Sequence, residues 1–146
     1  MKFARIVFTV AGVYGLIVLL PQYFLIEKNS RDFPPAITHA EYYYGFIGLA
    51  VAWQIAFLVL AKNPIRYRPL MLPTIVEKAA FGIPACILYI LGRLSVSLFA
   101  AGIIDLVLGL LFVAAYCLTP SEYRPGAERL NEETRFDETP SGEHYQ

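Results

Sequence analysis

The sequence predicts an all-α fold: an integral membrane four-helix bundle, N-in/C-in, with a disordered acidic C-terminal tail. Of its 146 residues 57% are hydrophobic, and the mean hydropathy is +0.52, so the chain is far more apolar than a soluble domain of this size. It also contains four apolar stretches close to the ~20 residues that a helix needs to cross a bilayer. We expect one compact unit, without room for a separate soluble catalytic domain.

The charges divide the chain into two parts. Residues 1–118, the expected transmembrane domain, carry nine Lys/Arg against five Asp/Glu, a net charge of +4. Residues 119–146 carry three Arg against seven acidic residues, a net charge of −4. Because Pro, Gly and Glu replace apolar residues from Thr119 onward, we expect this second part to be a disordered cytoplasmic tail.

The first span is expected over residues 6–26, an almost unbroken apolar run. A cleavable signal peptide would have a shorter apolar region followed by small residues at a cut site. Here the run continues through Pro21 to Ile26 without such a pattern, which favours a retained helix. Pro21 is expected to bend or end that helix near the interface.

The second span is expected over residues 42–61, after a polar loop at 27–41. Pro34 and Pro35 in this loop cannot continue a helix. The span begins with three consecutive tyrosines, Tyr42 to Tyr44. Tyrosine is enriched at membrane interfaces, where its ring and its hydroxyl face different solvents.

The third and fourth spans are expected over residues 70–91 and 97–118. The third is the least regular, because it contains two prolines, Glu77 and Lys78. A three-span protein, with this segment lying on the membrane surface, is therefore the alternative. Short connections after the second and third spans favour antiparallel neighbours and hence a four-helix bundle.

Loop charges predict the orientation, because Lys and Arg are enriched in cytoplasmic loops. One side of the predicted bundle collects seven basic residues and the other collects three. The first set is Lys2, Arg5, Lys62, Arg66, Arg68, Arg124 and Arg129, and the second is Lys28, Arg31 and Arg93. Both termini are therefore expected in the cytoplasm.

Glu77 and Asp105 are the most informative residues, because each is a carboxylate inside an apolar span. A charged group at the centre of a membrane helix costs about 2.5–3.5 kcal/mol on insertion scales, so it usually faces protein or a wet cavity. At ~1.5 Å per residue, the two carboxylates lie on levels about 8 Å apart, close enough for one hydrated pocket. With Gln54 and Tyr14, they are the candidate ligand-binding residues.

Purely structural interpretations compete with this site. Glu77 and Lys78 are also compatible with snorkelling toward the interface, with Glu77 paired to the basic turn that holds Arg66 and Arg68. For Asp105, the nearest obvious cationic partner in sequence is Arg93.

Small residues predict how the spans pack. Gly102 and Gly109 share a helical face with Asp105, and small residues let membrane helices approach closely. Gly48, Ala52 and Ala56 form a similar stripe on the second span, so we expect spans two and four to pack together.

Several site classes have no support in the sequence. A lone histidine, His39, stands near carboxylates, which is too little for a metal site, and no cofactor is expected. Cys86 and Cys117 lie in separate spans and are expected to be free thiols. No catalytic triad, phosphate loop or redox pair can be assembled, and the charge pattern gives no support for nucleic-acid binding.

Residues 63–71 (NPIRYRPLM), Glu77-Lys78, Asp105 and the Phe112-x-x-Ala115-Tyr116 pattern resemble a group of small bacterial four-span membrane proteins without an assigned activity. The resemblance covers roughly residues 40–118 and implies a bacterial inner-membrane location. In architecture only, the chain is also similar to the DoxX-like and sterol-isomerase-like (EXPERA) four-helix families. No catalytic residue of those families matches a position here.

The leading functional hypothesis is a non-catalytic membrane protein. It would bind a lipophilic small molecule, a membrane-protein partner or a second copy of itself through the polar spot in the bundle core. The alternatives are a membrane-embedded enzyme, using isomerase-like acid catalysis on a lipid, and a small proton- or ion-linked transporter. The sequence alone does not choose between an enzyme and a binding protein.

Overall fold

The computed structural model describes residues 2–121, and in this range helices are joined by loops and turns, with no strand. The tail predicted at 119–146 lies, from residue 122, outside the described residues. The elements are α1 (Lys2–Leu19), the 3₁₀ helix η1 (Leu20–Phe24), α2 (Ile26–Asp32), α3 (Ala40–Lys62), the 3₁₀ helix η2 (Arg68–Leu70), α4 (Met71–Ile90) and α5 (Val96–Leu118). Four helical segments, counting α1 with η1 and α4 with η2, are long and apolar enough to cross a membrane.

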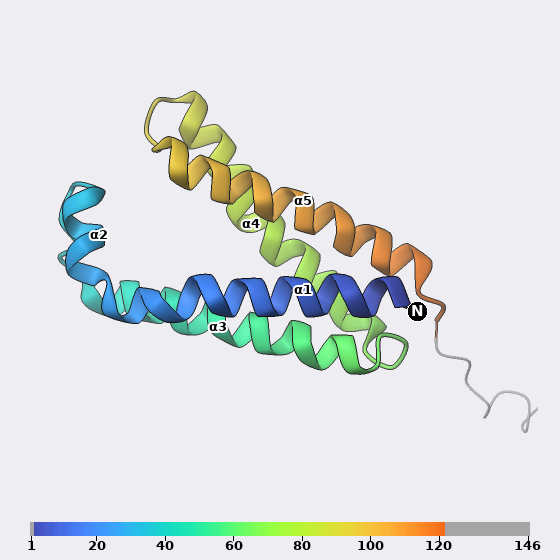
Figure 1. Ribbon diagram of the computed structural model, residues 1–146. Coiled ribbons are helices and arrows are strands. Elements are labelled where there is room, and N and C mark those ends of the chain that lie inside the picture. The colour runs from blue at the N-terminus through green and yellow to red at the C-terminus, as the bar shows by residue number, and fades with distance from the viewer. Residues whose placement is uncertain (1, 122–146) are drawn as a thin grey trace, which may run out of the picture.

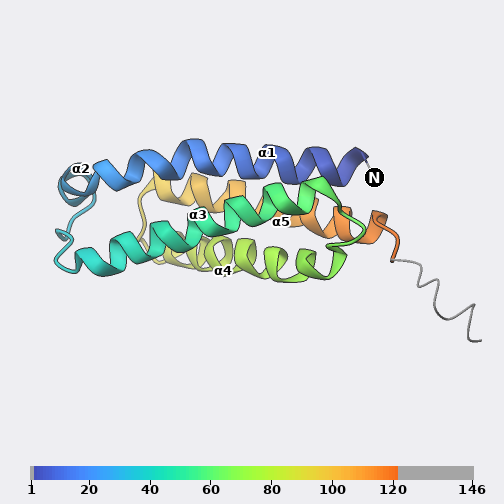
Figure 2. The ribbon, with the colours of Figure 1, turned by 90° about the horizontal axis from the view of Figure 1, so that it is seen from below.

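The four long helices form two antiparallel hairpins, α1 with α3 and α4 with α5 (Figure 1). The hairpins meet mainly through α1 and α5, whereas α3 and α4 contact each other only sparsely. The two pairs come together at the end that holds the N-terminus and the end of α5, and they diverge toward the end that holds α2 (Figure 1). Figure 2 shows the same bundle after a quarter turn. We call the end at which the hairpins meet the closed end, and the end at which they diverge the open end.

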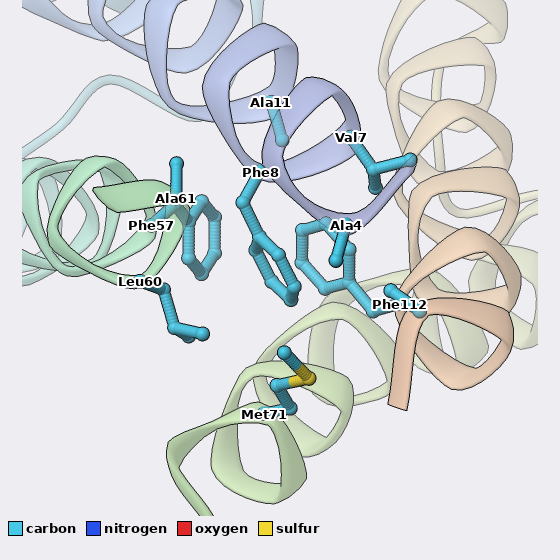
Figure 3. Packing of buried hydrophobic residues seen from close by; sticks show 10 residues of the cluster. Ala4, Val7, Phe8, Ala11, Phe57, Leu60, Ala61, Met71 and Phe112 are labelled. Atoms are coloured by element: carbon cyan, nitrogen blue, oxygen red, sulfur yellow. The ribbon is translucent and has the colours of Figure 1, made fainter. Parts of the chain in front are cut away.

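An aromatic core fills the closed end (Figure 3). Phe8 of α1, Phe57 of α3 and Phe112 of α5 are each fully buried. The ring centroids of Phe8 and Phe112 lie 4.4 Å apart, and those of Phe57 and Phe112 lie 5.1 Å apart. Met71, at the start of α4, is also fully buried in this cluster. Each long helix thus contributes a side chain to one core, which fixes the hairpins together at this end.

The expected pairing of spans two and four is wrong. A Cβ built on Gly102 of α5 would lie 2.5 Å from the Cβ of Ala85 in α4, and one built on Gly109 would lie 3.3 Å from the Cβ of Lys78. The small residues of α5 therefore face α4, where Gly82 is the complementary small residue. On α3, Ala52 is exposed and the nearest neighbour to a Cβ on Gly48 is the hydroxyl of Tyr23.

The third long helix is continuous. α4 runs from Met71 to Ile90 through Pro84, and it packs along α5 over its length. With η2, this helix is long and apolar enough to cross a membrane, like the other three. Pro73 occupies the first turn of α4, where a missing N–H leaves no helical hydrogen bond unmade.

The polar loop expected at 27–41 contains a further short helix, α2. It begins after η1, in which Pro21 lies, and it ends before Pro34 and Pro35. Asn29 of α2 donates hydrogen bonds to the side-chain oxygen of Gln22 (2.7 Å) and to the hydroxyl of Tyr43 (2.8 Å). These bonds tie α2 to the ends of α1 and α3 and explain why this segment is ordered.

Candidate functional site

Between the two hairpins lies a cavity of about 680 Å³ that all four long helices line. Most of the lining side chains are apolar, such as Val18, Phe46 and Phe81. Tyr14, Gln54, Glu77 and Asp105, the four residues singled out from the sequence, all line this one cavity together with Lys78. The cavity is partly open, and the hairpins that line it diverge toward the open end (Figure 1).

Lys78 joins the two carboxylates into one charge cluster. Its Nζ donates a hydrogen bond to Asp105 Oδ1 at 3.1 Å and lies 3.2 Å from Glu77 Oε2. The same ammonium lies 5.4 Å from the ring centroid of Phe57. Lys78 is only 5% exposed, whereas the side chains of Glu77 and Asp105 are each 19% exposed. The lysine is therefore the buried centre of the cluster, and the carboxylates are its cavity-facing flanks.

The packing of α4 on α5 positions this cluster. Gly82 and Gly102 let the two helix backbones approach closely, and Gly109 leaves room for the base of the Lys78 side chain. Lys78 then reaches Asp105 across the seam between the helices. Neighbours at i and i+1 do not normally face each other on a helix, so the pairing of Glu77 with Lys78 depends on the length of both side chains.

The partners expected for the carboxylates from sequence are different from those observed. Glu77 pairs with Lys78 and not with Arg66 or Arg68. The guanidinium of Arg68 instead lies 4.0 Å from the ring centroid of Tyr116 and donates to the Tyr116 carbonyl. Asp105 pairs with Lys78 and not with Arg93. Lys78 is buried and does not extend away from the bundle, as a snorkelling lysine would.

Gln54 and Tyr14 lie on the other hairpin. Gln54 is 3% exposed, and its Nε2 donates to the carbonyl of Ala50 on its own helix at 3.1 Å. Its side-chain oxygen lies against Gly15 of α1, where a Cβ would collide with it. Tyr14 is 40% exposed and contributes its ring and hydroxyl to the cavity wall. The cavity therefore has one polar patch on each hairpin.

Comparison with models of protein families, with curated proteins and with solved structures gives no match for this chain. The site must therefore be interpreted from its own chemistry. Within residues 2–121, no group of three or more His, Cys, Asp and Glu side chains is arranged to hold a metal ion. His39 contacts Glu41 at 3.0 Å on the exposed surface, and Cys86 and Cys117 are free thiols.

The charged groups of the cavity are two carboxylates and one ammonium, and its neutral lining adds the donors of Tyr14 and Trp53. Among the described residues Glu77 Oε2 is buried and has no hydrogen-bond partner, although it lies near the lysine. The donors of Lys78 point to the carboxylates, and Gln54 uses a donor on its own backbone. The ammonium of Lys78, 3.2 Å away, compensates the charge of the buried Glu77 oxygen. The partly exposed carboxylate of Asp105 is therefore the acceptor that a molecule in the cavity can reach.

Proposed function

We propose that the chain is an integral membrane protein that binds a lipophilic small molecule in the cavity between its hairpins. The observation that carries this proposal is a single cavity with apolar walls and one charged cluster. Ligand sites of about 300–1,000 Å³ commonly combine apolar walls with a few polar groups that fix orientation. The molecule would place its apolar part against side chains such as Val18 and Phe46, and its polar group beside Glu77 and Asp105.

The open side of the cavity supports a ligand that arrives from the bilayer. α3 and α4 share few contacts, and their flanks carry exposed apolar side chains such as Leu49 and Val76, which also line the cavity. In a bilayer these side chains contact lipid tails at no cost. A lipophilic molecule dissolved in the membrane can thus move sideways between α3 and α4 without passing through water.

Mass spectrometry of molecules that co-purify in mild detergent tests this proposal. Ala101→Phe enlarges a residue of α5 that lines the cavity, whereas Ala100→Phe enlarges its exposed neighbour on the same helix. We expect a bound molecule on the unmodified chain and on Ala100→Phe, and its loss from Ala101→Phe. Equal retention by both variants, or no bound molecule on any of them, contradicts binding in the cavity.

A membrane-embedded enzyme is the second candidate, and Glu77 is the specific reason. Its side chain is 19% exposed and lines the cavity beside Lys78, so its carboxyl group is within reach of a substrate as a general acid or base. The same experiment separates the two candidates. A binding protein releases the co-purified molecule unchanged, whereas an enzyme converts it, and Glu77→Gln abolishes that conversion.

We further propose a bacterial inner-membrane location with both termini in the cytoplasm. Lys2 and the end of α5 lie at the same end of the bundle (Figure 1), and the basic turn with Arg66 is at that end too. The excess of basic residues there supports a cytoplasmic closed end. A cysteine placed at residue 66 should react with a membrane-impermeant thiol reagent only from the cytoplasm, and one at residue 31 only from outside.

A further inference from the structure

The charge cluster is not neutral. Among the charged side chains that line the cavity there are two carboxylates, Glu77 and Asp105, and a single cation, Lys78. With all three ionised their sum is −1. Burying uncompensated charge in a low-dielectric region is unfavourable, so the cluster favours an occupant that supplies one positive charge.

No other lysine or arginine among residues 2–121 lines the cavity. Arg66 and Arg68 lie at the closed end, where they stack on Tyr67 and Tyr116. Arg93 belongs to the turn between α4 and α5 and does not line the cavity. The additional cation must therefore come from the ligand or, as a proton, from solvent.

The polar groups on the cavity wall favour the same charge. Asp105 meets Lys78 through Oδ1, and its partly exposed side chain lines the cavity, where its other oxygen is an acceptor that a ligand can reach. The side-chain oxygen of Gln54 accepts no hydrogen bond from its own helix, because only its nitrogen bonds to Ala50. An ammonium group has hydrogen-bond donors and a positive charge for these oxygens, whereas a carboxylate, sulfate or phosphate would be repelled by both acids.

Aromatic side chains provide a second kind of cation contact. Tyr14, Trp53 and Phe81 line the cavity from three different helices. Aromatic faces attract ammonium groups, and more strongly where both are shielded from water. Trp53, which interacts most strongly among ring types, lies on α3 one turn from Phe57, and the Phe57 ring already contacts the ammonium of Lys78.

We propose that the cavity selects a lipophilic molecule with a single positively charged ammonium headgroup. The headgroup lies beside Glu77 and Asp105, opposite the aromatic wall, and the apolar chain extends toward the gap between α3 and α4. This inference rests on the proposed function, since it names the chemical class of the molecule in that cavity.

Quenching of tryptophan fluorescence tests the charge selectivity, because Trp53 is the only tryptophan in the chain and lines the cavity. The protein is placed in phosphatidylcholine nanodiscs. Dodecylamine, dodecanol and dodecanoate, each with a terminal bromine, are the probes and are compared at equal mole fraction in the membrane. We expect the amine to reach half-maximal quenching at about a tenfold lower mole fraction than the alcohol, and the carboxylate to be the weakest.

Two variants separate the charge from the rest of the site. Asp105→Asn removes one acid from the cluster and should bring the amine close to the alcohol, while Glu41→Gln removes an exposed acid outside the cavity and should change nothing. The three probes are ranked on the unmodified chain, so this part of the test does not depend on whether a variant folds. Equal quenching by the three probes, or tightest binding of the carboxylate, overturns the ammonium inference.

The filled-cavity variant Ala101→Phe distinguishes this failure from failure of the proposed function. Trp53 contacts membrane probes to some extent wherever its ring meets lipid, and Ala101→Phe measures that background. If the unmodified chain is quenched more strongly than Ala101→Phe but equally by all probes, the cavity binds amphiphiles without charge selection. If the two proteins are quenched alike, the cavity binds none of the probes, and both proposals fail.

Discussion

The closed and open ends of the bundle are formed by the same four helices but differ in how closely those helices pack. At the closed end, Phe8, Phe57 and Phe112 stack into a core in which each ring is fully buried. At the open end the hairpins diverge, and aromatic residues such as Phe46 line a cavity and remain 58% exposed. The charge cluster lies at the boundary, because Lys78 contacts both Phe57 of the core and Asp105 of the cavity wall.

This difference separates stability from function within one bundle. Membrane helices gain little from burying apolar surface, since lipid tails are as apolar as a protein core, and they associate through close packing. The closed end supplies such packing between all four helices. At the open end the hairpins diverge (Figure 1), and the cavity of the proposed ligand takes the place of such packing.

The largest effect should come from the closed end. Phe112→Ala removes a ring that packs on two others, and we expect it to lower the free energy of unfolding by about 3–5 kcal/mol, as buried Phe→Ala changes do. Phe46→Ala, at the open end, is the matched change and should cost less than about 1 kcal/mol. Titration with sodium dodecyl sulfate in mild detergent measures both, and equal losses would contradict the division into two ends.

The boundary between the ends should be nearly as sensitive. Lys78→Met keeps the length of the side chain but leaves two buried carboxylates without their cation, which we expect to cost about 3 kcal/mol, the lower end for a broken buried ion pair. Lys62→Met, at the exposed end of α3, is the control and should change the same unfolding titration by less than about 0.5 kcal/mol. A stable Lys78→Met protein would mean that the acids are neutral before the lysine is removed.

The sequence predicts the helices well because its strongest signal is apolar length. The spans expected at 42–61 and 97–118 correspond to α3 and α5, whose observed bounds, Ala40–Lys62 and Val96–Leu118, differ by at most two residues. The short helix α2 was not predicted because it lies in a polar segment without an apolar pattern, and its Asn29 bonds to Gln22 and Tyr43 follow from how the helices pack.

The candidate site was predicted residue by residue but not as a network. Glu77 and Asp105 stand out as charges in apolar spans, and the same criterion applied to Lys78 would have found the third member. From sequence, a lysine in this position is equally compatible with snorkelling to the interface. Which cation pairs with which carboxylate depends on which helices pack together. Small residues alone do not specify the partner helix, because Gly102 could pack against any helix with a complementary small residue.

The seam between α4 and α5 offers the smallest and most local test of the comparison, because it runs from the closed end beneath the charge cluster. Gly102→Ala places a Cβ 2.5 Å from the Cβ of Ala85, and neither atom belongs to a flexible side chain, so the helices must separate. We expect a loss of about 1–2 kcal/mol in the unfolding titration, within the range for overpacking. Gly45→Ala is the control, because its new Cβ meets no atom within 4 Å and alanine has the higher helix propensity.

Since a wider seam also moves Asp105 away from Lys78, Gly102→Ala should in addition weaken quenching of Trp53 by the brominated amine, whereas Gly45→Ala should not. A Gly102→Ala protein with unchanged stability and unchanged quenching would show that the seam does not position the cluster.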